Sequence, residues 1–311
     1  MCDVNQTEVT EFLLLGFHGL YKYKFLLFIL FLFCYLIILA GNLLIIVLVS
    51  TNHNLNTPMF YFLKHLAVAD ILVTTTVMPM MLNIILLDMK EVPVRSCIIQ
   101  LYLFFIFGFI QCYLIALMSY DRYLAICRPM RYNSIMQSHV CFKMVLGSWF
   151  LLFLLSLEVI LFWQLEFCGQ NVIDHFFCDS VPLIELATSE THLLVSVDFL
   201  ISIVFGVTPF ALIILSYMRI FFTIIALPST IGRGKAFSTC SSHLTTVCIY
   251  YGTLFMVYMT PSDESSLSTN KFISLLYIMV APMMNPIIYS LKNHQIRRTL
   301  QQMFRKLNAK N

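Results

Sequence analysis

Runs of about 20 apolar residues recur along this chain, and they constrain its fold more than any other feature. Each run is long enough to cross the roughly 30 Å hydrocarbon core of a bilayer as one helix. Apolar residues make up 59% of the 311 residues and charged residues only 11%, whereas soluble domains have about 45–50% and about 25%. The composition therefore predicts an all-α membrane protein and argues against a soluble globular enzyme.

The apolar pattern predicts a bundle of seven transmembrane helices over 25–291. The spans run over about 25–50, 59–87, 98–126, 140–163, 196–226, 236–260 and 272–291. Residues 1–24 form a tail before the bundle and 292–311 a tail after it, in which a basic amphipathic stretch at about 293–306 is typical of a short interfacial helix. No internal repeat is evident, so an inverted-repeat transporter has little support.

The Lys and Arg residues indicate the orientation. Seven spans place the two ends of the chain on opposite sides of the membrane. With the C-terminus in the cytoplasm, 14 of the 19 Lys and Arg residues are cytoplasmic and five are outside, as the positive-inside rule requires. Asn5 then lies in the extracellular N-terminal tail, where Asn5-Gln6-Thr7 fits a glycosylation acceptor. The first 24 residues lack the pattern of a cleavable signal peptide, so the first span is expected to direct insertion.

Three of the ten cysteines, Cys97, Cys168 and Cys178, fall in the outer segments, where a disulfide can persist. His175 with Cys178 could mimic half of a metal site, but a disulfide at Cys178 would remove that ligand. Neither HExxH nor a pair of CxxC motifs occurs, so no metal or cofactor is expected. The net charge of +3 does not indicate a nucleic-acid partner, because the basic residues do not share one soluble face.

An acid–base pair, Asp121-Arg122, closes the third span within the stretch MSYDRYLAIC. Arg122 follows Cys97 by 25 residues, or about 37 Å of helix at 1.5 Å per residue. That length exceeds the hydrocarbon core, so the pair is expected at the cytoplasmic boundary, where it largely avoids the insertion cost of roughly 3 kcal/mol per central charge. An ordinary interfacial anchor and a functional pair both fit this position.

Asp70 lies deeper than any other charged residue of the spans. It follows Pro58 by 12 residues, about 18 Å of helix, which puts it near the midplane, where a carboxylate is costly and usually functional. Asn42, Gln111 and Asn285 lie at comparable depths, so the four residues could form one polar cluster. Interhelical hydrogen bonding alone would also account for them. No basic side chain in a span can pair with Asp70, which must be protonated, hydrated or bound to a cation.

Two prolines within the spans mark positions at which a helix can bend. Pro209 in span five and Pro286 in span seven each remove a backbone hydrogen bond and permit a kink. Asn285, Pro286 and Tyr289 place an amide, a kink and a phenol in little more than one turn, and packing alone requires none of these.

Together these motifs resemble the rhodopsin-like (class A) G-protein-coupled receptors, and within them the vertebrate odorant receptors. The segments that carry the resemblance are Gly41-Asn42, PMFYFLKHLAVAD at 58–70, MSYDRYLAIC at 118–127, Ser216-Tyr217, KAFSTCSSH at 235–243 and PMMNPIIY at 282–289. The outer-loop segment FCGQNVIDHFFCD at 167–179 is similar to the larger, tetrapod-type class. The resemblance covers essentially the whole chain, in order and at matching depths.

The resemblance implies a switch on the cytoplasmic face. Asp121 would hold Arg122 at rest and release it on activation to meet the carboxy-terminal helix of a G-protein α subunit. Tyr217 and Tyr289 would stabilise the open form, and His243 would help to hold the closed form. The set implied for coupling and switching is completed by Tyr123, Asn285 and Pro286. A ligand would bias such a two-state bundle through its preference for one state.

The resemblance also implies a disulfide between Cys97 and Cys178, and the sequence departs from the family at two places. Odorant receptors usually pair the equivalent of Cys168 with a second loop cysteine, but Thr188 stands at that position. Cys168 is then a free thiol or pairs elsewhere, and the loop is expected to be looser. The family often has Glu where Gln111 stands, which puts tight sodium binding beside Asp70 in doubt.

The ligand pocket that the resemblance implies is mostly aromatic and aliphatic with a few hydroxyls, which suits a small, largely apolar, neutral molecule with one polar handle. Amine receptors have Asp where Phe104 stands, so an amine anchored there is disfavoured. Receptors for carboxylic acids can carry Arg where Ser262 stands, so recognition of an acid is also disfavoured. Asp198 near the outer end of span five is the one acidic candidate for binding a ligand, and a solvated side chain fits that position equally well. The implied pocket residues are Phe104, Phe105, Gly108, Phe109, Cys112, Ile201, Ser202, Phe205, Tyr251, Leu254, Phe255, Tyr258, Leu275 and Ile278.

The expected function is that of an odorant receptor in the plasma membrane of olfactory cilia. It would bind a small volatile odorant and activate a stimulatory, olfactory-type heterotrimeric G protein that raises cyclic AMP. A receptor of the same architecture that senses a metabolite outside the nose remains an alternative, separable by its site of expression. A channel would need a continuous polar path, and only Asp70 lies deep. An enzyme would need a nucleophile and base in one cavity, and none is evident.

Overall fold

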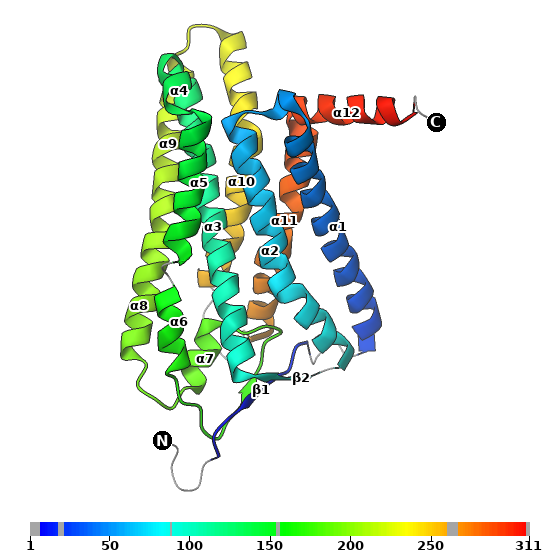
Figure 1. Ribbon diagram of the computed structural model, residues 1–311, viewed down its shortest axis with the longest axis vertical. Coiled ribbons are helices and arrows are strands. Elements are labelled where there is room, and N and C mark those ends of the chain that lie inside the picture. The colour runs from blue at the N-terminus through cyan, green and yellow to red at the C-terminus, as the bar shows by residue number, and fades with distance from the viewer. Residues whose placement is uncertain (1–6, 18–21, 88, 154–155, 260–266, 309–311) are drawn as a thin grey trace.

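The computed structural model describes residues 7–17, 22–87, 89–153, 156–259 and 267–308. Long helices run side by side through the molecule, and α12 lies across one end of them (Figure 1). The long helical elements are α1 (Lys24–Thr51), α2 (Pro58–Leu87), α3 (Val94–Cys127), α5 (Ser138–Phe153), α6 (Ser156–Trp163), α8 (His192–Ser202), η3 (Ile203–Val207), α9 (Thr208–Ala226), α10 (Thr230–Met259) and α11 (Leu267–Lys292). Every expected span therefore corresponds to a helix or to consecutive helical segments.

Five helical segments among the described residues are long and apolar enough to cross a membrane. These are Lys24–Thr51, Pro58–Leu87, Val94–Cys127, His192–Ala226 and Lys271–Lys292. α10 has the length of a span, but its first half contains the polar sequence TIGRGKAFSTCSSH. The fourth span is described as two helices, α5 and α6, on either side of residues outside the description. The arrangement is that of a helical bundle.

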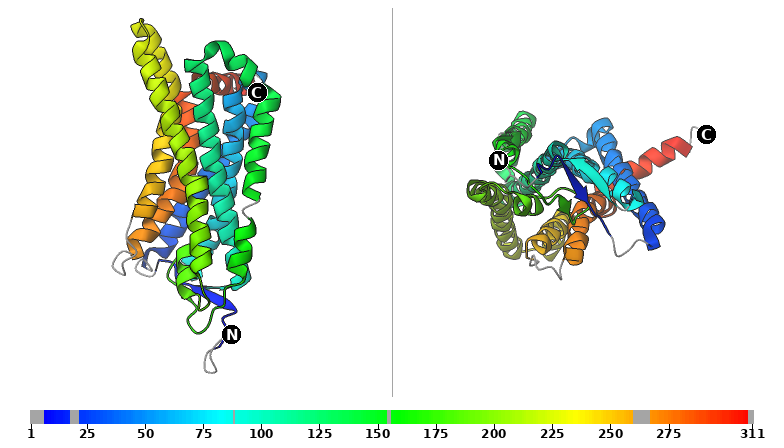
Figure 2. Two further views of the ribbon diagram at one scale, coloured as in Figure 1. Left: turned by 90° about the vertical axis from the view of Figure 1, so that its left-hand side faces the viewer. Right: turned by 90° about the horizontal axis from the view of Figure 1, so that it is seen from below.

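The burial pattern of α1 shows how a membrane helix packs on one side only. Its buried residues, Phe31, Ile38, Asn42, Ile45 and Leu48, recur at the spacing of one helix face. Large apolar side chains elsewhere on α1, such as Phe25 and Phe33, are exposed. Exposed apolar surface of this kind is what a hydrocarbon environment permits. By contrast, α3 buries side chains along most of its length, because helices pack against it from several sides (Figure 2).

A small sheet closes the end of the bundle that holds the N-terminus. Strand β1 (Glu11–Leu14) pairs antiparallel with β2 (Lys90–Pro93) and parallel with β3 (Val172–Ile173). Phe12 and Leu14 of β1 are fully buried, whereas Glu11 is exposed, as the two-residue period of a strand requires. The right-hand view of Figure 2 shows β1 lying across the bundle end. The sequence predicted only a tail here, since a four-residue strand is too short to give a periodic signal.

Short helices occupy the connections. They are η2 (His53–Leu55), α4 (Pro129–Ile135), α7 (Ser180–Leu186) and α12 (His294–Asn308). Pro129 stands at the first position of α4, where its missing N–H costs nothing. Asp179 caps α7, its side chain accepting from the Ser180 N–H at 2.8 Å. α12 coincides with the expected interfacial helix and buries Ile296 against the bundle.

The two prolines lie at local irregularities of the bundle: Pro209 follows a π-helical turn, and Pro286 lies at a close approach of two helices. The backbone of η3 is a π-helix that directly precedes Thr208 and Pro209, and the Thr208 hydroxyl donates to the Ile203 carbonyl at 3.3 Å. A π-turn here accommodates the carbonyl that the proline leaves without a donor. Pro286 packs so closely on Gly41 that a Cβ added to Gly41 would lie 2.9 Å from the proline Cγ. Glycine at position 41 thus permits the close approach of α1 and α11.

Candidate functional site

The implied ligand residues gather in the interior, at the half of the bundle nearer the N-terminus. Phe105, Phe109 and Phe205 form a chain of ring contacts, with centroids 5.9 Å and 5.7 Å apart. The residues of the set that the structure buries are Gly108, Phe109, Cys112, Phe205, Tyr251, Leu275 and Ile278. Those that it buries in part are Phe104, Phe105, Ile201, Ser202 and Leu254.

Two members of the set do not join this group in the same way. Phe255 is 41% exposed and packs edge-on against Phe210 of α9, with centroids 5.1 Å apart. It therefore belongs to the contact between α9 and α10 and faces the outside of the bundle. Tyr258 lies in α10, but its side chain is outside the described residues, as is Ser262.

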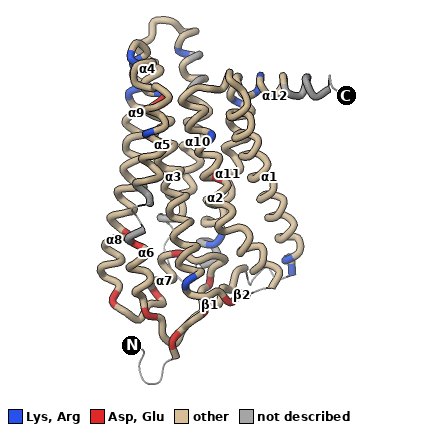
Figure 3. Tube along the Cα trace, in the orientation of Figure 1, with Lys and Arg blue, Asp and Glu red and all other residues tan. Residues whose placement is uncertain are grey.

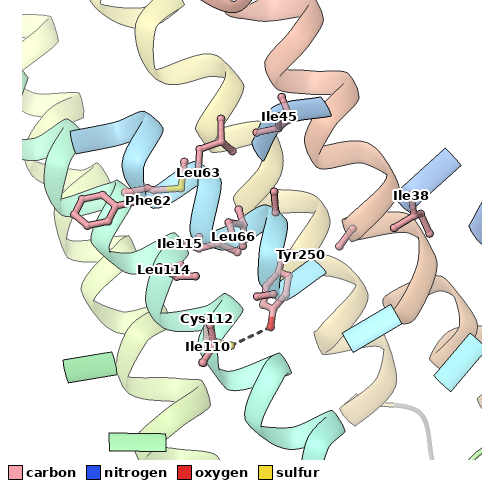
Figure 4. Packing of buried hydrophobic residues seen from close by; sticks show 14 of the residues in the cluster. Ile38, Ile45, Phe62, Leu63, Leu66, Ile110, Cys112, Leu114, Ile115 and Tyr250 are labelled. Carbon is pink, nitrogen blue, oxygen red and sulfur yellow. Dashed lines mark hydrogen bonds between the residues drawn. The ribbon is translucent and has the colours of Figure 1, made fainter. Parts of the chain in front are cut away.

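A polar network that the sequence did not single out lies within this group. The Tyr250 hydroxyl donates to the Gly108 carbonyl at 2.9 Å, lies 3.3 Å from the Tyr277 hydroxyl and lies 3.2 Å from Cys112 Sγ. Figure 4 shows the contact between Tyr250 and Cys112. Tyr250 precedes the predicted Leu254 by four residues, which is the spacing of one helix face, so this spacing was the available signal. Tyr277 is next to the predicted Ile278 in the chain. They supply hydrogen-bonding groups in an otherwise apolar region.

The loop between α6 and α7, which carries β3, covers this region. Phe177 contacts Phe104 of α3 with ring centroids 5.1 Å apart, and His175 packs against Phe177 at 4.6 Å. Burial and the nearby Lys271 ammonium lower the pKa of His175 to about 3, so its imidazole is neutral. Lys271 donates to the Gly16 carbonyl at 2.7 Å and to Asp174 at 2.5 Å. This lysine thereby joins α11, the N-terminal segment and the loop.

Two disulfide-bonded positions hold the same loop. Cys97 at the start of α3 is bonded to Cys178, the pairing that the resemblance implied. Cys168 is also disulfide-bonded, so of its two expected fates it pairs rather than remaining a free thiol. Thr188 does not leave the loop loose, because its N–H and hydroxyl both donate to the Glu166 carbonyl at 2.9 Å. The expected glycosylation site, Asn5, lies outside the described residues.

The predicted polar cluster at the midplane is assembled around Asp70. Its two carboxylate oxygens accept from the Gln111 amide at 2.7 Å and from the Asn285 amide at 2.8 Å. Asn42 is adjacent in the bundle and donates to the Pro282 carbonyl at 3.0 Å. All four polar side chains are buried. The Gln111 amide thus hydrogen-bonds to the Asp70 carboxylate and links spans two and three. The Asn285 amide links spans two and seven in the same way.

On the opposite half of the bundle, Asp121 is fully buried and holds Arg122 through an ion pair. The Arg122 Nε donates to Asp121 Oδ2 at 2.9 Å, while the Tyr132 hydroxyl of α4 donates to Oδ1 at 2.8 Å. Tyr132 was not predicted, because its position eleven residues after Asp121 becomes a contact only through the turn into α4. Tyr123 stacks on Tyr120 at 6.2 Å, on the same helix.

The other implied switch residues lie on α9, α10 and α11. The Tyr217 hydroxyl and His243 Nδ1 share a hydrogen bond of 2.6 Å that joins α9 to α10. Tyr289 is fully buried, and Pro286 is buried against α1. Lys292 adds a hydrogen bond of 2.9 Å to Thr245, which joins α11 to α10. At this end of the bundle, one described hydrogen bond joins α9 to α10 and another joins α10 to α11.

Among the described residues, no three His, Cys, Asp or Glu side chains lie together in a way that could hold a metal ion. Nothing in the geometry of this part of the chain points to chemistry on a bound substrate. The arrangement is instead an apolar interior lined by rings, separated by a polar midplane from a face with a buried Asp–Arg pair.

Comparison with known proteins agrees with this arrangement. A model of the family described as "Olfactory receptor" matches residues 31–307. The chain is 44% identical to human Olfactory receptor 5G3 over 298 residues, covering 96% of this chain and 95% of that protein. It is 42% identical to mouse Olfactory receptor 5G26 over 307 residues, covering 98% and 96%. Squid rhodopsin shares the fold with a TM-score of 0.72 at 19% identity, covering 92% of this chain and 87% of that one.

Proposed function

We propose that this chain, which belongs to the olfactory receptor family, binds a small, mostly apolar, neutral odorant among its helices and activates a stimulatory heterotrimeric G protein that raises cyclic AMP. Members of this family are multi-pass receptors of the plasma membrane and not enzymes. The observation that supports the proposal best is the combination, in one bundle, of a ring-lined interior with a fully buried Asp121 paired to Arg122.

The ligand class follows from the lining. The phenylalanines at positions 104, 105, 109 and 205 offer apolar contact, which discriminates weakly, by about 1–3 kcal/mol per methylene. The hydroxyls of Tyr250 and Tyr277 offer one place for a carbonyl or hydroxyl of the ligand to bond. Broad tuning among neutral molecules with one oxygen function is the expected result.

Activation would require a ligand to prefer one of two arrangements of the bundle. Moving a two-state equilibrium from 1:99 to 99:1 takes roughly 5.5 kcal/mol of differential binding. The contacts that would change are the single polar links of the inner face, from Asp121 to Arg122 and from Tyr217 to His243. Freed from Asp121, the Arg122 guanidinium would be available to the G-protein α subunit.

The orientation proposed from the sequence has support in the distribution of charge. Figure 3 shows Lys and Arg prominent near α4, α9 and α12, and Asp and Glu prominent at the end with β1 and α7. We place the end with α4 and α12 in the cytoplasm and the end with β1 and α7 outside the cell. Residence in olfactory cilia, contact with membrane lipid along the exposed face of α1, and glycosylation at Asn5 belong to the same proposal.

The test is a cyclic AMP reporter assay in cells that express the receptor with a stimulatory α subunit, over a panel of neutral odorants. Arg122→Ala is expected to abolish the ligand-evoked rise while surface expression stays at the wild-type level. Arg219→Ala, which removes an exposed guanidinium of α9, is the matched control and should respond normally. A normal response of the Arg122 variant refutes the mechanism.

A further inference from the structure

Cys168 belongs to a disulfide bond whose second cysteine follows from a count of the sulfurs. The chain has ten cysteines. Cys97 and Cys178 are bonded to each other, and Cys168 is also disulfide-bonded. The other cysteines of the described residues are free thiols, namely Cys34, Cys112, Cys127, Cys141, Cys240 and Cys248. Because these account for nine of the ten, Cys2, which lies outside the described residues, is the one that remains.

The N-terminal segment lies directly beside Cys168. The Gly169 N–H donates to the Thr7 carbonyl at 3.2 Å, and Glu8 is opposite Cys168 in an antiparallel bridge. Cys2 precedes Thr7 by five residues, which span at most about 17 Å. That length is enough for the chain to turn back toward the bridge and bring the two Cα atoms to the roughly 4.4–6.8 Å that a disulfide needs. The bridge therefore keeps Cys2 within reach of Cys168.

Thr188 stands where odorant receptors usually have the loop cysteine that pairs with the equivalent of Cys168. The structure keeps this part of the loop in place, since Phe167 forms an antiparallel bridge with Ala187. A threonine cannot form the bond, so the second sulfur has to come from another part of the chain. The segment that starts at Thr7 and pairs with the stretch around Cys168 is the part that leads directly to a further cysteine.

We infer that a disulfide between Cys2 and Cys168 fastens the N-terminal tail to the loop between α6 and α7. The other disulfide ties Cys178 of the same loop to the start of α3. The stretch from Cys168 to Cys178 carries β3 and Phe177, whose ring lies 5.1 Å from that of Phe104 in the ring-lined interior. This stretch is then held covalently at both ends, and the tail acts as a strap on the cover of the interior.

The bond forms by thiol–disulfide exchange. The two thiols lose their protons and two electrons, and the electrons reduce the disulfide of a protein oxidant in the secretory pathway to a pair of thiols. Cys168 lies at the end of the bundle that we place outside the cell, where such a bond persists. The inference needs neither an odorant nor a G protein, so a failure of the proposed function leaves it untouched.

Disulfide mapping of the purified wild-type receptor tests the pairing directly. Free thiols are blocked with N-ethylmaleimide under denaturing, non-reducing conditions, and the chain is then cleaved at aspartates. Cleavage at Asp174 separates Cys168 from Cys178, so mass spectrometry reads the two bonds apart. The fragment with Cys168 is expected to be linked to the N-terminal fragment with Cys2. A Cys168 that is blocked by the reagent, or linked to any other cysteine of this chain or a second copy, overturns the inference.

Counting the reactive thiols of denatured, unreduced variants gives an independent answer. The wild type should have the six free thiols named above. Cys2→Ser and Cys168→Ser should each show one more, because each releases the partner, and the double variant should return to the wild-type count. Cys34→Ser removes a free thiol of α1 and is the control, which should show one fewer. A count for Cys2→Ser that is equal to or below that of the wild type overturns the bond.

Thermal unfolding in nanodiscs of phosphatidylcholine tests whether the bond holds the cover in place. Loss of the cross-link in Cys2→Ser should lower the unfolding midpoint by about 2–4 °C or more. Cys168→Ser should lower the midpoint by a similar amount and the double variant no further, since both changes break one bond. An unchanged midpoint, or additive losses in the double variant, overturns the role of the tail as a strap.

Discussion

Replacement of Tyr132 by Phe tests the resting state of the inner face with the loss of a single oxygen atom. The Tyr132 hydroxyl donates to Oδ1 of Asp121 at 2.8 Å, and Asp121 is fully buried. A hydrogen bond to a charged group contributes about 1.5–3 kcal/mol, and since Tyr132 is only half-buried we take the lower end. If the bond exists only at rest, its loss shifts the equilibrium by roughly tenfold, from about 1% active to about 10%.

The readout is cyclic AMP in the absence of ligand, normalised to receptor at the cell surface. Tyr120→Phe is the control, because Tyr120 also lies at the inner end of α3 and its ring stacks on Tyr123. We expect a roughly tenfold rise in basal signal for the Tyr132 variant and none for the Tyr120 variant. An unchanged or lower basal signal at equal surface expression would show that Asp121 does not depend on α4 to hold Arg122.

Three further predictions concern other buried groups. Asp174→Ala leaves the buried Lys271 ammonium without its acid, whereas Lys271→Met leaves Asp174, which is 39% exposed, in contact with water. In thermal unfolding, Asp174→Ala should therefore lose about 1–2 kcal/mol more stability than Lys271→Met. The opposite order would contradict this account. Gln111→Glu places a second carboxyl beside Asp70, so its unfolding midpoint should rise in sodium chloride relative to choline chloride at equal ionic strength, with the wild type indifferent to the exchange. Because the pKa of His175 is lowered to about 3, the unfolded chain takes up a proton below about pH 6.5 that the folded chain does not, and stability is lost as the pH falls. His175→Phe should remove about 2–3 kcal/mol of the stability loss between about pH 6.5 and 4.5. Identical pH profiles of the variant and the wild type would disprove the shift.

The sequence predicted the bundle well because a membrane leaves few alternatives. Backbone groups in hydrocarbon must be satisfied within a helix, so an apolar run of sufficient length fixes both the element and its extent to within a few residues. The position of Asp70 among Asn285 and Gln111 followed for the same reason, since depth along a helix is set by residue count. α12 was found from its basic, amphipathic pattern alone.

The remaining features depend on contacts that have no local signal. Strand β1 is defined by its partners β2 and β3, which lie about 80 and 160 residues away in the chain. Tyr132 reaches Asp121 only after the chain turns into α4. Phe255 is 41% exposed and packs on Phe210, a contact that depends on how α10 lies beside α9 and has no local signal in the sequence.

Strand β1 has a practical consequence, because it is the central strand of its sheet. The segment of residues 8–16 hydrogen-bonds to both the connection before α3 and the loop that covers the ring-lined interior. Trimming the chain into this segment would leave β2 and β3 without their shared neighbour and would release the Lys271 contact at Gly16. An epitope tag for surface labelling therefore belongs ahead of residue 7. Antibodies that bind residues 8–16 should detect only receptors in which the sheet of β1, β2 and β3 has unfolded.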